Sequence, residues 1–247
     1  QDCTVVLITT DKCYENLEWE FGYRETDRLG GQDPYSASKA MAELAFSSYF
    51  RSYLSQKKNL QIASARAGNV IGGGDWAKDR IVPDTIKAWA SGRQVELRNP
   101  QATRPWQHVL EPLSGYLRLG QALVNGTDKV NGEPFNFGPK ADANVSVQTL
   151  VLEMGKTWPN NYIEAKTKTE AKKECSLLRL SCDRAHHYLE WQAVLTFKET
   201  TRMATEWYLH HHQNGPADMR DFTLTQIQQY ETLARERHHF WTQSNHS

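Results

Sequence analysis

The sequence predicts an α/β fold in which helices pack against a sheet of parallel strands. Residues 4–10 form a short, nearly all-apolar run rich in β-branched side chains, which is typical of a strand buried on both faces of such a sheet. Residues 35–53 are rich in Ala, Met, Glu and Leu, which favour a helix. Residues 60–66 repeat the pattern of a buried strand. Strands that alternate with helices in this way indicate a parallel sheet.

The other elements are expected from turn and capping signals. Residues 11–32 are polar and aromatic and should form a loop, and residues 68–76 form a glycine-rich turn. In the middle of the chain we expect a helix from about Pro83 to Ser91 with Gly92 past its end, a short strand at 95–97, a helix at 113–124 and a strand at 135–138. The last third should hold a helix capped by Ser146 that ends at Gly155, a helix at 197–212 with Met203, Trp207 and Tyr208 inward, and a polar helix at 225–240.

The composition excludes several classes of protein. The 247 residues include 29 Lys and Arg and 29 Asp and Glu, so the net charge is zero and indicates no global preference for nucleic acid or acidic membranes. The mean hydropathy is −0.68 and no long apolar run is present, which excludes a membrane-spanning helix. Because no leader is recognisable at the start, we expect a cytoplasmic protein without nucleic-acid or membrane partners.

The cysteines and histidines do not predict a metal site. Cys3, Cys13, Cys175 and Cys182 are scattered and form no CxxC pair, which favours reduced structural thiols in a cytosolic protein. Three histidines stand together at residues 210–212 inside an expected helix. Adjacent helical residues point in different directions, so these three cannot converge on one ion. We therefore expect no bound metal.

Tyr35 and Lys39 can form an acid–base pair at the start of the expected helix. Four residues advance about 400° around a helix, so both side chains lie on one face, one turn apart. A lysine ammonium beside a phenol stabilises the phenolate, which makes a tyrosine usable as a general base. The same spacing also arises often by chance, and the pair is then only packing plus a solvated amine.

Thr10, Asp11 and Lys12 directly follow the first strand. Ligands of open α/β sheets bind outside the carboxyl ends of the strands, where a hydroxyl, a carboxylate and an ammonium group are well placed for acid–base chemistry. Without further context, an ordinary strand-to-loop transition with a capping Asp explains these residues equally well.

The glycine-rich turn after the second strand lets the backbone pass close to a ligand. The glycines at 72–74 do not match Gly-x-Gly-x-x-Gly, so a phosphate-binding loop is not supported. Asn69 can hydrogen-bond a ligand, and Arg80 and Arg104 can clamp a phosphate because guanidinium groups bind oxyanions in bidentate fashion. Each arginine taken alone is better explained as a surface charge.

Together these residues resemble a known family. Tyr-x-x-x-Lys, one helix after a strand that ends in a hydroxyl residue, resembles the extended short-chain dehydrogenase/reductases that act on nucleotide sugars. Four longer segments look like the CDP-glucose 4,6-dehydratases of that branch: TDKCY at 10–14, GGQDPYSASK at 30–39, RAGNVIGGGDW at 66–76 and RPWQHVLEPL at 104–113. The similarity runs in order over nearly the whole chain, and the third and fourth segments are its most specific parts.

The resemblance implies a fold and a division of the chain. The fold would be a Rossmann-type doubly wound parallel sheet with a smaller, mainly helical substrate-binding domain. Residues 1–140 would be the C-terminal part of the NAD-binding domain, with interleaved substrate-binding segments at about 66–108, and residues 141–247 would be mainly substrate-binding. Roughly a hundred residues of the family's N-terminal βαβαβ half, including its glycine-rich pyrophosphate turn, have no counterpart in the sequence. We therefore expect an incomplete sheet, a C-terminal part of a longer protein and weak or no NAD binding by this chain alone.

The resemblance also implies a reaction. The enzyme would be a lyase that removes water from CDP-glucose to give CDP-4-keto-6-deoxyglucose, a precursor of polysaccharide sugars, through transient oxidation at C4 by bound NAD. A 4-ketone acidifies the C5 proton, so that water can be lost across C5 and C6. The cofactor carries the redox step and the protein supplies placement and proton transfer.

The family's roles carry over to matching positions. Tyr35 would remove the proton of the C4 hydroxyl, and Lys39 would hold the nicotinamide ribose and stabilise the Tyr35 phenolate. Thr10, where the family usually has Ser, would hydrogen-bond the same sugar hydroxyl, and Asp11 would protonate the leaving C6 hydroxyl. Lys12 stands where dTDP-glucose dehydratases have Glu and would assist removal of the C5 proton. The nucleotide diphosphate would be held by Asn69, Arg80 and Arg104.

Several alternatives stay open. A nucleotide-sugar 4-epimerase or another 4,6-dehydratase has a similar outline, although an epimerase needs no counterpart of Asp11 and Lys12. A non-catalytic C-terminal fragment that binds a sugar nucleotide or dimerises is the alternative from another class. Family members are typically homodimers through a four-helix contact, which here would include the Tyr35 helix. Its aromatic residues Phe46, Tyr49, Phe50 and Tyr53 fit that contact and fit core packing equally well.

Overall fold

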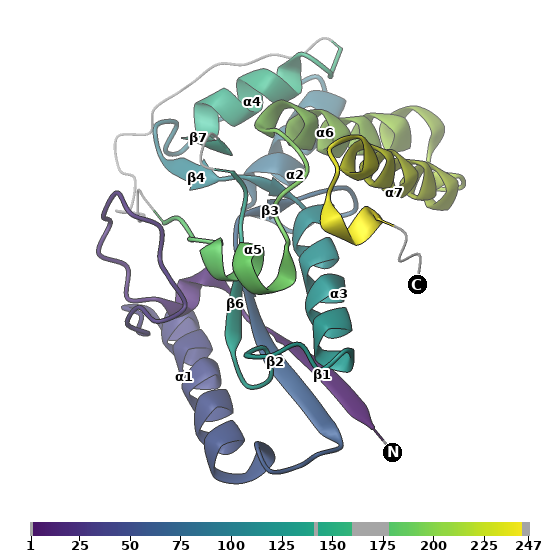
Figure 1. Cartoon of the computed structure of the whole chain (residues 1–247). Helices are drawn as coiled ribbons and strands as arrows, with labels where there is room; N and C mark the ends of the chain where they lie inside the picture. Colours follow the sequence, from purple (N-terminus) through teal and green to yellow (C-terminus); the bar gives the residue numbers. More distant parts are fainter. Residues whose placement is uncertain (1, 141–142, 160–177, 244–247) are drawn as a thin grey trace.

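A three-stranded parallel sheet forms the centre of one half of the molecule (Figure 1). The computed structural model describes residues 2–140, 143–159 and 178–243. The strands are β1 (Cys3–Ile8), β2 (Leu60–Ala67) and β6 (Pro134–Phe137), in the spatial order β1-β2-β6. All neighbours are parallel, so the carboxyl ends of the strands lie at one edge of the sheet.

Helices cover both faces of this sheet. Figure 1 shows α1 (Pro34–Tyr49) on one side, and α3 (Leu110–Val124) and α5 (Asp183–Leu189) on the other. Successive strand residues point to opposite faces. The three alanines of β2 therefore pack into the apolar core under α3, whereas Ser64 and Arg66 reach across to α1.

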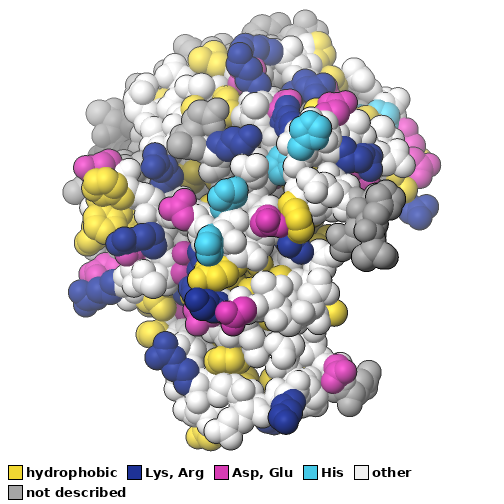
Figure 2. All heavy atoms as spheres, in the orientation of Figure 1, with side chains coloured by type: hydrophobic (Ala, Val, Ile, Leu, Met, Phe, Trp, Pro, Cys, Tyr) yellow, Lys and Arg dark blue, Asp and Glu magenta, His cyan; other side chains and the backbone are white. Residues whose placement is uncertain are grey.

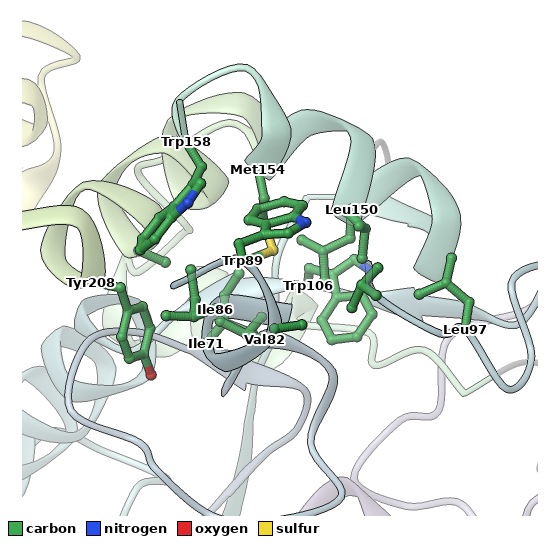
Figure 3. Close-up of a cluster of buried hydrophobic side chains, with 14 residues drawn as sticks. Ile71, Val82, Ile86, Trp89, Leu97, Trp106, Leu150, Met154, Trp158 and Tyr208 are labelled. Carbon is green, nitrogen blue, oxygen red and sulfur yellow. The ribbon is translucent and has the colours of Figure 1, made fainter. Parts of the chain in front are cut away.

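A second half, made of helices and short strand pairs, lies beyond the carboxyl ends of the sheet. Its helices are α2 (Ile81–Ala90), α4 (Val147–Gly155), α6 (Phe197–Asn214) and α7 (Met219–Glu236). Its paired strands are β3 (Val70–Ile71) with β5 (Gln107–His108), and β4 (Thr103–Pro105) with β7 (Asn144–Ser146). Side chains from α2, α4 and α6, among them Trp89, Met154 and Tyr208, form one buried cluster that joins these elements (Figure 3).

Most of the expected elements are confirmed. The helix at 35–53 corresponds to α1 followed by one wider turn at Phe50–Leu54. Ser146 caps α4 by accepting a hydrogen bond from the Thr149 amide at 3.0 Å. Met203 and Tyr208 are fully buried, and Trp207 is partly buried, as expected for the inward side of α6. Ser146 and Thr196 begin their helices because an N-cap hydroxyl satisfies an amide at the helix start.

Three expectations about elements are wrong. β1 is not buried on both faces, because it lies at the edge of the described sheet, and Ile8 is 55% exposed. Residues 95–97 form no strand, because only Val95 makes an isolated β-bridge; Val95 and Leu97 are buried in the cluster shared with α2, α4 and α6. The last helix begins at Met219, earlier than the expected residue 225, and ends at Glu236, before the expected residue 240.

In α1, unlike an ordinary amphipathic helix, most of the large apolar side chains face outward. Met41, Leu44, Tyr49 and Tyr53 are more than half exposed, whereas the buried residues of α1 are Ser36, Ala40, Glu43 and Phe46. The side of α1 that faces the sheet is therefore largely polar, and its apolar side faces outward.

The surface shows both signs of charge. On the face drawn in Figure 2, Lys and Arg side chains are interspersed with Asp and Glu side chains rather than gathered by sign. Within the described residues, no helix is both long enough and apolar enough to cross a lipid bilayer. Cys3, Cys13 and Cys182 are free thiols, while Cys175 lies outside the described residues.

Candidate active site

A cavity of about 530 Å³ opens at the carboxyl ends of β1 and β2, between the two halves of the molecule. It brings together residues that are far apart in the sequence. Six of the expected site residues line it, and these are Thr10, Asp11, Lys12, Tyr35, Asn69 and Arg80. The position agrees with the general rule that open parallel sheets bind ligands at this edge.

The turn after β1 presents a buried carboxyl group. Thr10 caps a short 3-10 turn at Asp11–Cys13, and its Oγ1 accepts a hydrogen bond from the Lys12 amide at 3.3 Å. The same hydroxyl donates to Asp11 Oδ1 at 3.0 Å. Asp11 is only 2% exposed, and burial raises its pKa, although the nearby Lys12 ammonium and the Thr10 hydroxyl oppose the shift. A carboxyl group with a raised pKa can hold a proton and deliver it to a leaving group.

Gly68 leaves the space that Asp11 occupies. A Cβ atom at this glycine would lie 1.9 Å from Asp11 Oδ2, well inside any contact distance. The carboxyl of Asp11 therefore fits at the end of β1 only because the chain leaving β2 carries no side chain at this point.

Tyr35 lies in the first turn of α1, at the rim of the cavity. The helix begins there because Asp33 accepts a hydrogen bond from the Ser36 amide at 3.0 Å and Pro34 occupies the first helical position. Lys39 Nζ lies 5.6 Å from the centroid of the Tyr35 ring, so the expected pairing on one helix face is present. Tyr35 is 55% exposed, and with Lys12 it also lines a second cavity of about 540 Å³.

The turn after β2 positions Asn69 and its neighbours. Asn69 has a positive φ of 51°, which turns the chain from β2 into β3. Gln107 of β5 holds this turn by donating hydrogen bonds to the carbonyls of Gly68 at 2.9 Å and Phe137 at 3.1 Å. Arg80, which precedes α2, lies 3.6 Å from Asp75 across the cavity mouth.

Two expected site residues do not line the cavity. Lys39 lies one turn behind Tyr35 and contacts the ring rather than the cavity. Arg104, on β4, donates a hydrogen bond to the Thr103 carbonyl at 2.8 Å. Its positive charge nevertheless lies close enough to Asp11 to oppose the rise of that pKa.

Several further residues line the cavity that the sequence analysis did not name as site residues. Asp75 and Trp106 belong to the two most specific segments and could have been recognised there. Tyr208 comes from α6, more than a hundred residues away, and its hydroxyl donates to the Asp75 carbonyl at 2.8 Å. No local pattern connects it with the turn at Asp75, so only the tertiary structure reveals this contact. Among the described residues, no group of three or more His, Cys, Asp or Glu side chains could hold a metal ion.

Comparisons with known proteins give the chain its relatives. It is 42% identical over 208 residues to the CDP-glucose 4,6-dehydratase of Salmonella typhimurium, which covers 83% of this chain and 58% of that protein. It is 26% identical over 214 residues to the dTDP-glucose 4,6-dehydratase of Haemophilus influenzae, covering 82% of this chain and 60% of that one. The chain thus spans about three fifths of the length of these relatives.

Solved structures show the same fold. The dTDP-glucose 4,6-dehydratase of Bacillus anthracis, in complex with NAD, superposes with a TM-score of 0.66 at 19% identity, over 85% of this chain and 62% of that chain. An epimerase from Methanothermobacter thermautotrophicus superposes with a TM-score of 0.69 at 17% identity, over 85% and 60% of the two chains. These similarities confirm the expected α/β fold with a parallel sheet. A model of the family described as GDP-mannose 4,6 dehydratase matches residues 1–204, and because this is most of the chain, the chain belongs to that family.

Proposed function

We propose that the complete protein containing this chain is an NAD-dependent lyase that removes water from CDP-glucose and yields CDP-4-keto-6-deoxyglucose. The observation that carries the proposal is the cavity, in which the buried Asp11 carboxyl and the exposed Tyr35 phenol stand on neighbouring elements. Identity of 42% to a CDP-glucose 4,6-dehydratase supports the choice of substrate.

The cavity residues can divide the proton transfers between them. Tyr35 removes the proton of the C4 hydroxyl, and the Lys39 ammonium lies over its ring. Thr10 orients that hydroxyl. Asp11 protonates the leaving C6 hydroxyl, a role that suits a carboxyl whose pKa is raised by burial. The C5 proton, which the neighbouring ketone makes acidic, passes to water, and the positive charge of Lys12 assists by stabilising the enolate that forms.

The Tyr35 end of the cavity fits the nicotinamide ribose of NAD. The Tyr35 phenol is exposed at the rim and Lys39 lies one helical turn behind it, so the Lys39 ammonium can donate hydrogen bonds to ribose hydroxyls and the Tyr35 oxygen can accept one. When bound there, NAD supplies the hydride acceptor for C4 and the hydride donor for C6. The residues of this chain supply orientation and proton transfer.

The opposite wall fits a nucleotide diphosphate. Arg80 stands at the cavity mouth before α2, and Asn69 projects from the turn after β2. Arg80 is paired with Asp75 only at 3.6 Å and both side chains are partly exposed, so a diphosphate can compete for the guanidinium. Arg104 adds positive charge on the side of Asp11.

The outward apolar side of α1 suggests a homodimer. Met41, Leu44 and Tyr49 of α1 and Tyr53 of the turn that follows it are 57–66% exposed, and such exposed large apolar side chains favour contact with a second copy. The free thiols of the buried Cys13 and the partly buried Cys182 fit a reducing compartment, so we place the protein in the cytoplasm.

Replacing Tyr35 with Phe in the complete protein tests the function. We expect turnover of CDP-glucose to fall at least ~10³-fold while KM stays nearly unchanged, because only the proton acceptor is lost. Mass spectrometry of the wild-type product should show the loss of one water. Tyr49→Phe, which removes a hydroxyl from the same helix outside the cavity, is the matched control and should retain activity. Full activity of Tyr35→Phe would refute the assignment, and a product of unchanged mass would indicate an epimerase.

A further inference from the structure

A buried carboxylate on α1 connects the two elements that carry the proposed chemistry. Glu43 is 2% exposed and lies two turns beyond Tyr35 on α1. Its Oε1 accepts a hydrogen bond from the Thr9 hydroxyl, and Thr9 directly precedes the Thr10–Lys12 turn. One side chain thus joins the helix that carries Tyr35 and Lys39 to the strand end that carries Thr10 and Asp11.

The other carboxylate oxygen of Glu43 is held by β2. Its Oε2 accepts hydrogen bonds from Ser64 Oγ at 2.9 Å and from Arg66 Nη2 at 2.8 Å. Arg66 is itself 3% exposed, so this is a buried ion pair. Burial alone would raise the pKa of Glu43, but the hydrogen bonds from Arg66, Thr9 and Ser64 outweigh it and lower the pKa, so the carboxylate stays ionised.

Arg66 extends the connection to β6 at the other edge of the sheet. Its Nη1 donates to the Tyr14 hydroxyl at 2.8 Å, and that hydroxyl donates to Asn136 Oδ1 on β6 at 2.7 Å. The network therefore reaches from α1 through β1 and β2 to β6, behind the floor of the cavity. Its hydrogen bonds have fixed directions, so α1 cannot slide along the sheet without breaking several of them.

Few large apolar side chains of α1 are buried against the sheet. Of its four buried side chains, only Phe46 is large and apolar; Ser36 and Ala40 are small. Apolar contacts are non-directional and would tolerate a shift. A buried ion pair adds little net stability compared with apolar side chains of similar volume, so its contribution here is orientation.

We propose that Glu43 is a positioning residue: through Thr9 and Arg66 it sets the placement of Tyr35 and Lys39 relative to the Thr10–Lys12 turn. This inference rests on the proposed function, because it concerns the geometry of that site. Misplacement of reacting groups by about 1 Å costs on the order of 10²-fold in rate. Loss of the Glu43 contacts should therefore lower kcat and leave KM and the nucleotide contacts nearly unchanged.

Paired variants of the complete protein separate positioning from stability. Thr9→Val removes the hydrogen bond to Glu43 while keeping the side-chain volume, and Thr9→Ser keeps the hydroxyl. We expect Thr9→Val to lower kcat at least ~10-fold with KM within about two-fold, and Thr9→Ser to stay close to wild type. Thr201→Val is the matched control, because it removes a buried threonine hydroxyl that donates to the Phe197 carbonyl at 2.9 Å, away from the cavity.

A second set of variants removes the ion pair itself. Glu43→Gln should lower kcat by ~10²-fold, and it leaves the Arg66 charge without its partner, so its melting temperature should also fall. The double variant Glu43→Leu with Arg66→Met restores an uncharged core, and we expect its melting temperature to recover while kcat stays low. Recovery of kcat together with the melting temperature would show a purely structural role and overturn the inference.

The outcome for Thr9→Val decides the inference even if the ion-pair variants fail to fold. A kcat within two-fold of wild type in folded Thr9→Val would overturn it. Failure of the proposed function is distinguishable, because the wild-type protein would then release no dehydrated product from CDP-glucose or other nucleotide sugars. In that case both proposals fall together.

Discussion

Asp11 shows how single residues prepare the cavity for acid–base chemistry. Its carboxyl is almost completely buried at the end of β1, where burial raises its pKa while Lys12, Thr10 and Arg104 only partly compensate. The space for it is provided by Gly68 on the neighbouring strand end. The position of the Asp11 carboxyl therefore depends on Gly68, and a substitution at either residue should change the activity.

Gly68→Ala should displace the Asp11 carboxyl. The added Cβ would lie 1.9 Å from Oδ2 and close to the other carboxyl atoms, so the side chain must rotate away. We expect kcat of the complete protein to fall ~10-fold or more, because the proton donor is misplaced. Gly30→Ala is a suitable control, since its Cβ would meet Glu15 at an ordinary 3.5 Å. Equal activities of the two variants would contradict this account of Gly68.

Asp11→Asn should abolish the dehydration activity and make the folded protein more stable at pH 7. The folded-state pKa of Asp11 is raised, so the stability associated with its neutral form is fully present below the unfolded pKa and is lost as pH rises through the folded pKa. Asparagine stays neutral throughout. Urea unfolding should therefore find the variant more stable than wild type at pH 7 and about equal near pH 3, while dehydration is abolished. Asp128→Asn, at an exposed position, should show no such difference between the two pH values.

At the scale of elements, helices α1 and α3 meet the sheet in different ways. α1 presents polar side chains to β1 and β2, and the ion pair of Glu43 and Arg66 connects them. α3 presents small and apolar residues to the other face, where Leu119 and Phe137 belong to the same buried cluster. Close approach on this face depends on glycine, because the Phe137 ring lies directly against α3 at Gly115.

Two glycines of α3 should respond to alanine in opposite directions. A Cβ at Gly115 would lie 2.3 Å from the Phe137 ring, so Gly115→Ala should destabilise the fold by about 1–3 kcal/mol through overpacking. A Cβ at Gly120 would meet only Val6, at 3.8 Å, so Gly120→Ala should stabilise the helix by about 0.5–1 kcal/mol. Chemical unfolding of both variants measures the difference. Stabilisation by both variants would mean that helix propensity, not packing, governs these positions.

At the scale of the whole molecule, the halves meet at the cavity and along α3. Glu111 of α3 accepts hydrogen bonds from the amides of Val194 and Leu195 at 3.0 and 2.6 Å, and from the Tyr230 hydroxyl of α7 at 2.8 Å. This buried carboxyl joins the sheet half to the last helices. The outward side of α1 also matters for the whole molecule, because its large apolar side chains are exposed rather than buried in the fold.

Leu44→Glu should weaken the proposed homodimer. A carboxylate placed in an apolar contact loses its hydration without gaining a partner, which should raise the dimer dissociation constant ~10²-fold or more. Analytical ultracentrifugation of the complete protein over a range of concentrations measures this. Leu224→Glu makes the same change at an exposed position of α7 and should leave the assembly unchanged. A wild-type protein that sediments as a monomer at all concentrations would contradict the dimer.

The sequence by itself determined the alternation of strands and helices around the sheet and the N-cap of α4, and it placed Thr10–Lys12 and Asn69 after strands and Tyr35 at the start of a helix. These follow from local rules, because periodicity, capping and a resemblance over contiguous residues all read neighbouring positions. The outward side of α1, the edge position of β1 and the contacts of Glu43, Gly68 and Tyr208 were decided only by the tertiary structure. The physical reason is that the burial and the charge partners of a side chain depend on segments far away in the chain. A local sequence pattern does not show which distant segments will pack against it.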